Sequence, residues 1–170
     1  MSVPARSTKF EFCIPDAADT SNLKFLSTQH YVHAVWYQKN ENPGIYLSSN
    51  LAPGSDFSNP ERIIETNGEV KDIQIIAKDN DFVITIIENV SGSTYVRAAT
   101  GIVKDNLSHQ FKPCEKVEVE GDIINAYTIF TETASEDHIF VRVEIVRRDG
   151  LICFKIDEVV FIHCTRLSAR

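Results

Sequence analysis

Short apolar runs separated by turn-forming residues follow one another along almost the whole chain. Val, Ile, Thr, Tyr and Phe dominate these runs, and apolar and polar positions alternate within many of them. A period of two residues is typical of β-strands with one buried face. Residues 16–25 are the best candidate for a helix, but few of their apolar positions have helical spacing, so we interpret them as a loop leading into a strand. The pattern therefore predicts an all-β protein.

The strand pattern also repeats, with an offset of 50 residues. Residues 22–36 align without a gap over residues 72–86, and the polar turn at 28–30 then falls over the turn at 78–80. The match continues with small gaps, from residues 44–50 to 93–99 and from 55–65 to 109–120. A weaker third copy has its four strands at 124–132, 138–146, 151–156 and 159–164.

Each unit thus contains about four short antiparallel strands in roughly 50 residues, which is the size of one β-propeller blade. We expect a single domain over residues 1–170, with blade-like units at about 22–66, 72–120 and 121–164. Residues 8–14 predict a leading outer strand that could complete the last blade. The alternative fold is a two-sheet β-sandwich made of duplicated hairpins. The two folds differ in whether the units stack radially or face to face.

One polar loop carries a resemblance to a known family. The first unit reads VWYQ, then GIYLSS, a polar loop and F-S-x-P, which resembles the BNR/Asp-box family of sialidase-like β-propellers over about residues 22–120. That family's loop reads Ser-x-Asp-x-Gly-x-Thr-Trp/Phe. Asn replaces Asp here, Asp replaces Thr, and the loop is two residues longer before the glycine. The residues that stand at the five family positions are Ser48, Asn50, Gly54, Asp56 and Phe57.

The residue types in this loop also have a physical explanation of their own. Ser48 and Asn50 can bond nearby backbone groups and fix a tight turn. Gly54 can adopt the positive φ that such a turn requires, and Phe57 can bury about 150 Å² or more at the edge of the sheet. We therefore interpret the loop as a folding device and not as a catalytic site.

Charge and composition narrow the possible partners. The chain has 170 residues, a net charge of −7 and a pI of about 5.2. An acidic protein repels phosphate backbones, so we expect neither nucleic acid nor membrane as a partner. The N-terminal residues lack an apolar signal region, which predicts a cytoplasmic protein. The four cysteines contain no CxxC pair and are interpreted as plain thiols; they are Cys13, Cys114, Cys153 and Cys164.

Catalytic chemistry finds little support in the sequence. Sialidases of the family that this chain resembles use an arginine triad, a tyrosine–carboxylate pair and an acid/base aspartate, and no arginine motif stands near the start of this chain. There is also no HExxH motif, no GxSxG elbow and no glycine-rich phosphate loop. We therefore predict no catalytic residues, no metal site and no cofactor.

These observations favour a non-enzymatic binding or protein-interaction module. Its candidate contact residues are four aromatics in strand-like runs, Trp36, Tyr37, Tyr46 and Tyr95, on which a sugar ring could stack; the alternative is that they pack within the fold. The second function that we consider is a carbohydrate-binding, lectin-like or degenerate sialidase-like protein. The ligand is thus expected to be a glycan or a protein.

The number of units predicts self-association. Propellers typically contain four or more blades, and three units would leave uncovered sheet faces and edges. Two copies would supply six blades, so we hypothesise a homodimer whose halves complete one ring.

Overall fold

The computed structural model describes residues 12, 14, 20–39, 41–51, 56–132, 139–157 and 160–163. All regular structure in these residues is β-strand, and every pair of neighbouring strands is antiparallel. The prediction of an all-β fold is therefore confirmed. Within the part of the chain that is described, no helix is long and apolar enough to cross a membrane.

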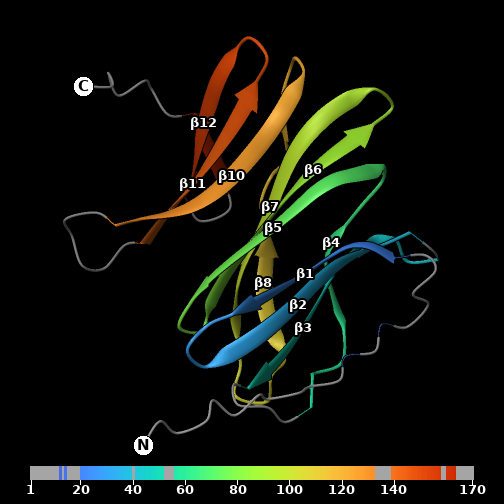
Figure 1. Cartoon of the computed structure of the whole chain (residues 1–170), viewed down its shortest axis with the longest axis vertical. Coiled ribbons are helices and arrows are strands. Elements are labelled where there is room, and N and C mark those ends of the chain that lie inside the picture. Colours follow the sequence, from blue (N-terminus) through green and yellow to red (C-terminus); the bar gives the residue numbers. More distant parts are fainter. Residues whose placement is uncertain are drawn as a thin grey trace, which may run out of the picture.

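Three sheets follow one another along the chain, and Figure 1 shows them as successive layers. In each sheet the first four strands are neighbours in sequence order, which makes each sheet an antiparallel meander. The first sheet contains β1 (Thr20–Ser27), β2 (Tyr31–Gln38), β3 (Gly44–Leu51) and β4 (Glu61–Glu65). The second contains β5 (Glu69–Lys78), β6 (Asp81–Val90), β7 (Ser93–Val103), β8 (His109–Pro113) and β9 (Val117–Glu118). The third contains β10 (Ile123–Glu132), β11 (Ile139–Arg147), β12 (Gly150–Asp157) and β13 (Val160–His163).

Tight turns set the register of these meanders. Ser91 and Gly92 join β6 to β7 with φ angles of 52° and 87°. Two consecutive positive φ angles are typical of a type I′ turn, whose twist matches that of the strands it joins. Asp79, between β5 and β6, also has a positive φ of 53°. The hairpin ends at 78–80 and 28–30 lie where the repeat predicts turns.

The fourth strand of the second unit is less regular than the alignment of residues 55–65 with 109–120 implies. Residues 109–120 form two short strands, β8 and β9, and both pair with β7. Pro113 ends β8 because it has no backbone N–H for a continuous ladder. In the first unit, residues 56–60 lie outside a strand, and pairing with β3 begins at Glu61 and contains a register shift between Ile45 and Tyr46.

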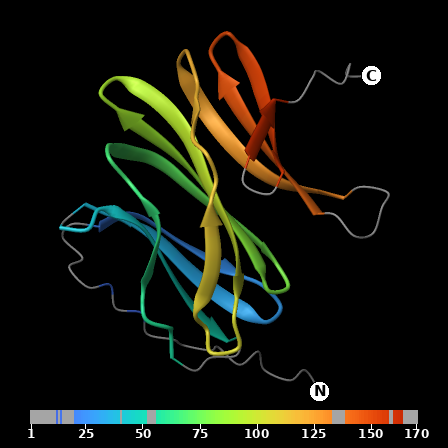
Figure 2. The same cartoon turned by 180° about the vertical axis from the view of Figure 1, so that it is seen from behind.

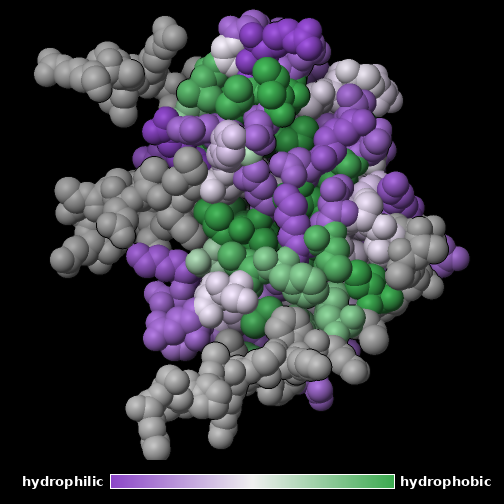
Figure 3. All heavy atoms as spheres, in the orientation of Figure 1, coloured by the Kyte–Doolittle hydropathy of each residue, from purple (hydrophilic) through white to green (hydrophobic). Residues whose placement is uncertain are grey.

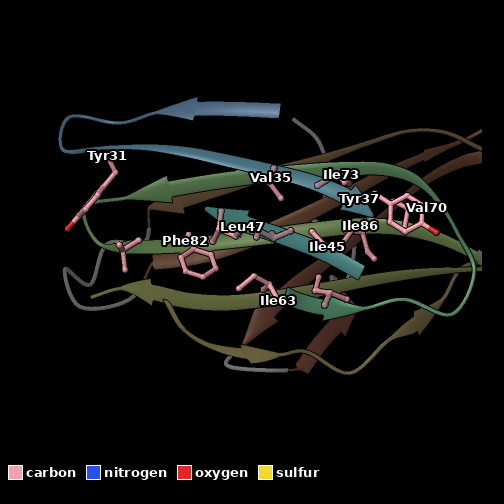
Figure 4. Close-up of a cluster of buried hydrophobic side chains, with 14 residues drawn as sticks. Tyr31, Val35, Tyr37, Ile45, Leu47, Ile63, Val70, Ile73, Phe82 and Ile86 are labelled. Carbon is pink, nitrogen blue, oxygen red and sulfur yellow. The ribbon is translucent and has the colours of Figure 1, made fainter. Parts of the chain in front are cut away.

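Two hydrophobic clusters join the three sheets. One lies between the first and second sheets and includes Val35, Ile45, Ile73 and Phe82 (Figure 4). The other lies between the second and third sheets, where residues of β6 and β7 meet residues of β10, β11 and β12. The second sheet is therefore buried on both faces, which explains why seven consecutive positions of β6, from Phe82 to Glu88, are buried.

The sheets stack in the same sense. Residues Val35 and Tyr37 of the first sheet face the second. Their repeat equivalents under the offset of 50 are Thr85 and Ile87, and Ile87 faces the third sheet. Conversely, Phe82, Ile84 and Ile86 face the first sheet. In the first and second sheets, positions that are equivalent in the repeat therefore point toward the same end of the stack.

Polar contacts join the first strands of the three units. Lys24 of β1 bonds Asp72 at 3.0 Å and the backbone oxygen of Ile73, both in β5. Gln74 of β5 donates to the backbone oxygen of Ala126 in β10 and accepts from the backbone N–H of Thr128. β4 and β8 also contact one another, as the view from behind shows (Figure 2). The described strands form three separate open sheets and do not close into a ring.

Candidate functional site

Two of the four predicted contact residues, Trp36 and Tyr46, lie together on the face of the first sheet that points away from the second. Their rings stack 6.0 Å apart at 18°. Trp36 has no exposed surface. The ring of Phe12 packs over this face, 5.4 Å from Trp36, 5.6 Å from Phe25 and 4.8 Å from Phe57. We call the face formed by Phe25, Val32, Ala34, Trp36, Tyr46 and Ser48 the outer face of the first sheet.

The other two predicted contact residues lie elsewhere. Tyr37 is buried between the first and second sheets, where its hydroxyl donates to the backbone oxygen of Gly68 at 3.0 Å and burial raises its pKa. Tyr95 of β7 is half-buried, with the ammonium group of Lys116 4.6 Å from its ring centre. The four aromatics therefore do not converge on one site, and their binding role stays a prediction.

The loop with the Asp-box resemblance is held by hydrogen bonds within the first unit. Ser48 is buried and donates from Oγ to the backbone oxygen of Ser58, while Ser58 donates from its backbone N–H to the oxygen of Ser49. Asn50 is also buried, Asp56 is exposed and Phe57 is half-buried against Phe12. Gly54 lies outside the described residues. These bonds are of the side-chain-to-backbone kind that fixes a loop.

A chain of four polar side chains crosses the interface between the first and second sheets. Oγ of Ser49 lies 2.8 Å from Nδ1 of His33 and 2.7 Å from Nε2 of His109. Nδ1 of His109 lies 2.9 Å from Oε1 of Glu61, which also accepts from the backbone N–H of His109 at 2.8 Å. Ser49, His109 and Glu61 thus have the serine–histidine–carboxylate order of a hydrolase triad.

The acceptor atoms in this row of hydrogen bonds determine which nitrogen of each histidine carries its proton. Glu61 accepts from Nδ1–H of His109, so Nε2 of His109 is free to accept the hydroxyl proton of Ser49. The Ser49 oxygen then accepts from Nδ1–H of His33. Every bond is satisfied with both histidines neutral, and only Nε2 of His33 has no partner among the described residues.

Both histidines are accordingly difficult to protonate. Burial, together with the charge that His109 would carry, lowers the pKa of His33 from 6.5 to about 4. Burial also lowers the pKa of His109, although Glu61 acts in the opposite direction. A second proton on His33 would place an unpaired N–H in the interior, which is unfavourable.

The triad order does not make this a catalytic site. Ser49 and the side chain of His109 have no exposed surface, and of the three groups only Glu61 reaches solvent, with 31% of its side chain exposed. A serine nucleophile needs a substrate-accessible Oγ and donors for the developing oxyanion. Ser49 lies mid-sheet and has neither. The chain of bonds instead joins two sheets through residues 60 positions apart.

Sequence reasoning did not identify this chain of residues. The available signal was His33, which alternates with apolar residues on β2 and therefore must lie on a packed face with a polar partner. The identity of that partner depends on which sheet covers the face, so no local pattern around His109 or Glu61 indicates it.

A second buried polar group, Glu88, joins the first two units at their connection. Its carboxylate accepts from the backbone N–H groups of Asn67 and Gly68 at 2.6 and 2.9 Å, and pairs with Arg97 at 3.0 Å. Arg97 also donates to the backbone oxygen of Glu65. Glu88 is 1% exposed, so its charge depends on these partners for stabilisation.

A polar cleft of about 640 Å³ lies where the second sheet meets the third. Its walls come from the beginnings of β5, β7 and β10 and the ends of β6 and β11. The lining combines hydroxyl, amide and carboxylate groups with two cations and several apolar side chains, and its polar residues are Lys71, Asp72, Asn89, Thr94, Asp122, Asn125 and Arg148. Among the described residues, no three His, Cys, Asp or Glu side chains gather to hold a metal ion.

The third sheet has one face that no other described sheet covers. Val143, Ile145, Phe154 and Ile156 point toward the second sheet. The alternating positions of β10, β11 and β12 lie on the opposite side. Register places Glu144 between Tyr127 and Cys153, and Arg142 beside Lys155. We define the outer face of the third sheet as Tyr127, Arg142, Glu144, Val146, Leu151, Cys153 and Lys155.

Two large side chains are exposed on this outer face, Tyr127 at 46% and Leu151 at 57%. Ile124, which is 65% exposed, lines the polar cleft instead. Figure 3 shows hydrophobic surface bordered by hydrophilic residues at the end of the molecule that the third sheet occupies. Arg142 and Glu144 form an ion pair of 2.6 Å within the face.

Comparison of the chain with protein-family models found no match, and comparison with curated proteins found none either. The BNR/Asp-box resemblance therefore stays a prediction that depends on residues 48–57 and on the strand repeat.

Proposed function

We propose that the chain is a non-catalytic protein-interaction module, built from three propeller-like units, that binds its partner through the outer face of the third sheet. The observation that carries this proposal is the exposure of Tyr127 and Leu151, 46% and 57%, on a face that no other described sheet covers. Contiguous apolar surface rimmed by polar groups is characteristic of interaction sites.

The propeller-like arrangement is supported by the sense of stacking. Equivalent faces of successive sheets point in the same direction, and contacts through Lys24 and Gln74 bring the three first strands together. Radial packing of blades around their first strands has both properties. A sandwich of three sheets shares the face-to-face packing but does not require the first strands to meet.

A non-catalytic function is supported by the burial of the Ser49–His109–Glu61 array. It is the one hydrolase-like constellation that we find among the described residues, and Ser49 has no exposed surface. The array therefore acts in folding, by joining the first and second sheets.

Affinity capture with purified protein as bait tests the proposal, with Leu151→Glu as the matched variant. We expect wild type to recover a partner protein that Leu151→Glu does not recover. Ile102→Glu is the control and should still recover this protein, because Ile102 is 40% exposed on the second sheet and lies off the proposed surface. Equal recovery by wild type and Leu151→Glu would contradict the surface. Turnover of a fluorogenic sialoside that Ser49→Ala abolishes would contradict a non-catalytic function.

The second candidate function is glycan binding, and the polar cleft between the second and third sheets favours it. Its amide, hydroxyl and carboxylate lining suits a polyhydroxylated ligand. A glycan-array signal that Asn89→Ala and Thr94→Ala reduce, and that Leu151→Glu leaves unchanged, would support this function over protein interaction.

A further inference from the structure

We infer that Asn67 is a deamidation site whose reaction the buried carboxylate of Glu88 suppresses in the folded protein. Asn67 and Gly68 form the only Asn-Gly pair of the chain, and they lie in the connection between β4 and β5, which joins the first unit to the second. Glycine has no Cβ, so its backbone nitrogen is the least hindered nucleophile that can follow an asparagine. The inference is independent of the proposed function.

The reaction needs only water and consumes the side-chain amide of Asn67. The backbone nitrogen of Gly68 loses its proton to solvent and attacks the side-chain carbonyl carbon of Asn67, which forms a new C–N bond. The bond from that carbon to the amide nitrogen then breaks, and the nitrogen takes up a proton and leaves as ammonia. Water opens the resulting five-membered succinimide at either carbonyl, which gives aspartate or isoaspartate.

The fold itself requires the reactive neighbour of Asn67. A Cβ at residue 68 would collide with the backbone oxygen of Asn89 in β6, so only glycine fits there. The backbone oxygen of Gly68 also accepts from the hydroxyl of Tyr37 at 3.0 Å. Asn67, in contrast, is exposed, and its side-chain amide has no hydrogen-bonding partner within the described part of the chain. The connection thus combines an unhindered nucleophile with an amide that solvent reaches.

Glu88 holds the two backbone nitrogens that flank Asn67. Its Oε1 accepts from the N–H of Asn67 at 2.6 Å and from the N–H of Gly68 at 2.9 Å. Both backbone torsions of Asn67 lie between these nitrogens, and attack requires a rotation that brings the Gly68 nitrogen to the side chain. The negative carboxylate also disfavours the anionic nitrogen that attacks. Glu88 is 1% exposed and pairs with Arg97 at 3.0 Å, so its own position is fixed.

Deamidation hinders the connection from closing again. Aspartate at position 67 adds a negative charge next to Glu88, and like charges near a buried carboxylate are unfavourable. Isoaspartate inserts one methylene into the main chain between residues 67 and 68, where Gly68 has no space beside Asn89. The modification therefore leaves a permanent covalent mark on molecules in which the connection has opened.

Incubation of wild type at mildly alkaline pH, in native buffer and in guanidinium chloride, measures the protection. Peptide mass mapping follows conversion of Asn67, and labelling by a protein isoaspartate methyltransferase detects the isoaspartate product. We expect conversion in native buffer to be at least about a hundredfold slower than in denaturant, because the reaction requires local opening. Asn67→Ser removes the reacting amide and should abolish the signal at this peptide. Equal rates in the two solutions would overturn the inference.

Substitution of Glu88 separates its effect from that of overall stability. Glu88→Ala should deamidate at least about tenfold faster than Ile145→Ala, which removes a buried side chain between the second and third sheets and destabilises the fold away from this connection. Denaturant midpoints of both variants are measured in parallel. Equal acceleration in variants of equal midpoint would overturn the inference, because unfolding of the whole chain would then control the reaction.

Glu88→Gln provides the test that does not depend on a large loss of side chain. It keeps the shape of Glu88 and removes its charge, so Asn67 should again react faster than in wild type. A slower reaction than in wild type would overturn the inference, because the carboxylate would then act as the base that removes the proton of Gly68.

Discussion

Oγ of Ser49 in the first sheet lies 2.7 Å from Nε2 of His109 in the second, within a buried interface. This hydrogen bond joins two units of the chain that are 60 residues apart in sequence. It belongs to the array from His33 to Glu61, in which burial lowers the pKa of both histidines. Serine, histidine and carboxylate side chains activate a nucleophile when they lie in an accessible cleft. Here the same residue types join two layers of the fold.

Ser49 should be chemically inert in the folded protein. A fluorophosphonate probe must reach Oγ, and this atom is covered on all sides. We expect no labelling of native protein and no change in labelling with Ser49→Ala, as measured by mass spectrometry of the intact chain. Stoichiometric labelling at Ser49 would show that the interface opens to solvent.

Stability should fall as the pH decreases from about 6.5 toward 4. The folded-state pKa of His33, about 4, is below its unfolded value of 6.5, so the unfolded state binds more protons in this window and gains in relative stability. The full contribution, up to about 3 kcal/mol, is present above pH 6.5 and is lost progressively as the pH falls. Urea unfolding at several pH values measures the slope.

His33→Asn should reduce that slope, because Asn can donate to Ser49 but does not titrate. His30→Gln, at an exposed turn position, is the matched histidine control. A slope in His33→Asn as steep as that of wild type would mean that other groups cause the acid sensitivity.

Removing the carboxylate of Glu88 should destabilise the connection between the first and second units. Glu88→Ala leaves two backbone N–H groups and Arg97 without their acceptor, and loss of one partner of a buried ion pair typically costs about 3–5 kcal/mol. Glu69→Ala, at an exposed carboxylate on β5, is the control and should leave the denaturant midpoint unchanged. Equal midpoints for both variants would contradict the role of Glu88.

Trp36, the only tryptophan of the chain, should report on the contact with Phe12. Its fluorescence should be blue-shifted and poorly quenched by acrylamide, because its ring is buried between Phe12 and Tyr46. Phe12→Ala should shift the emission to longer wavelength and increase quenching. Unchanged emission in Phe12→Ala would show that Phe12 does not cover this face in solution.

Much of the strand order could be predicted from the sequence. The alternation of apolar residues and the offset of 50 residues indicate the β1–β2 and β5–β6 hairpins, and the weaker third copy indicates β10 to β13. Local chemistry is sufficient for these features, because a turn and its two flanking strands are neighbours along the chain. The split of residues 109–120 into β8 and β9 is a finding of the structure.

The pairing of faces was decided by tertiary structure. β2 reads YVHAVWYQ, and its first seven positions are buried. Alternation assigns Trp36 and Tyr37 to opposite faces, but when both faces are apolar it gives no indication of what covers each one. The sequence by itself therefore determined that the chain folds into successive antiparallel meanders. Only the tertiary structure brought Ser49 to His109, placed Phe12 on Trp36, and left Tyr127 and Leu151 of the third sheet about half exposed.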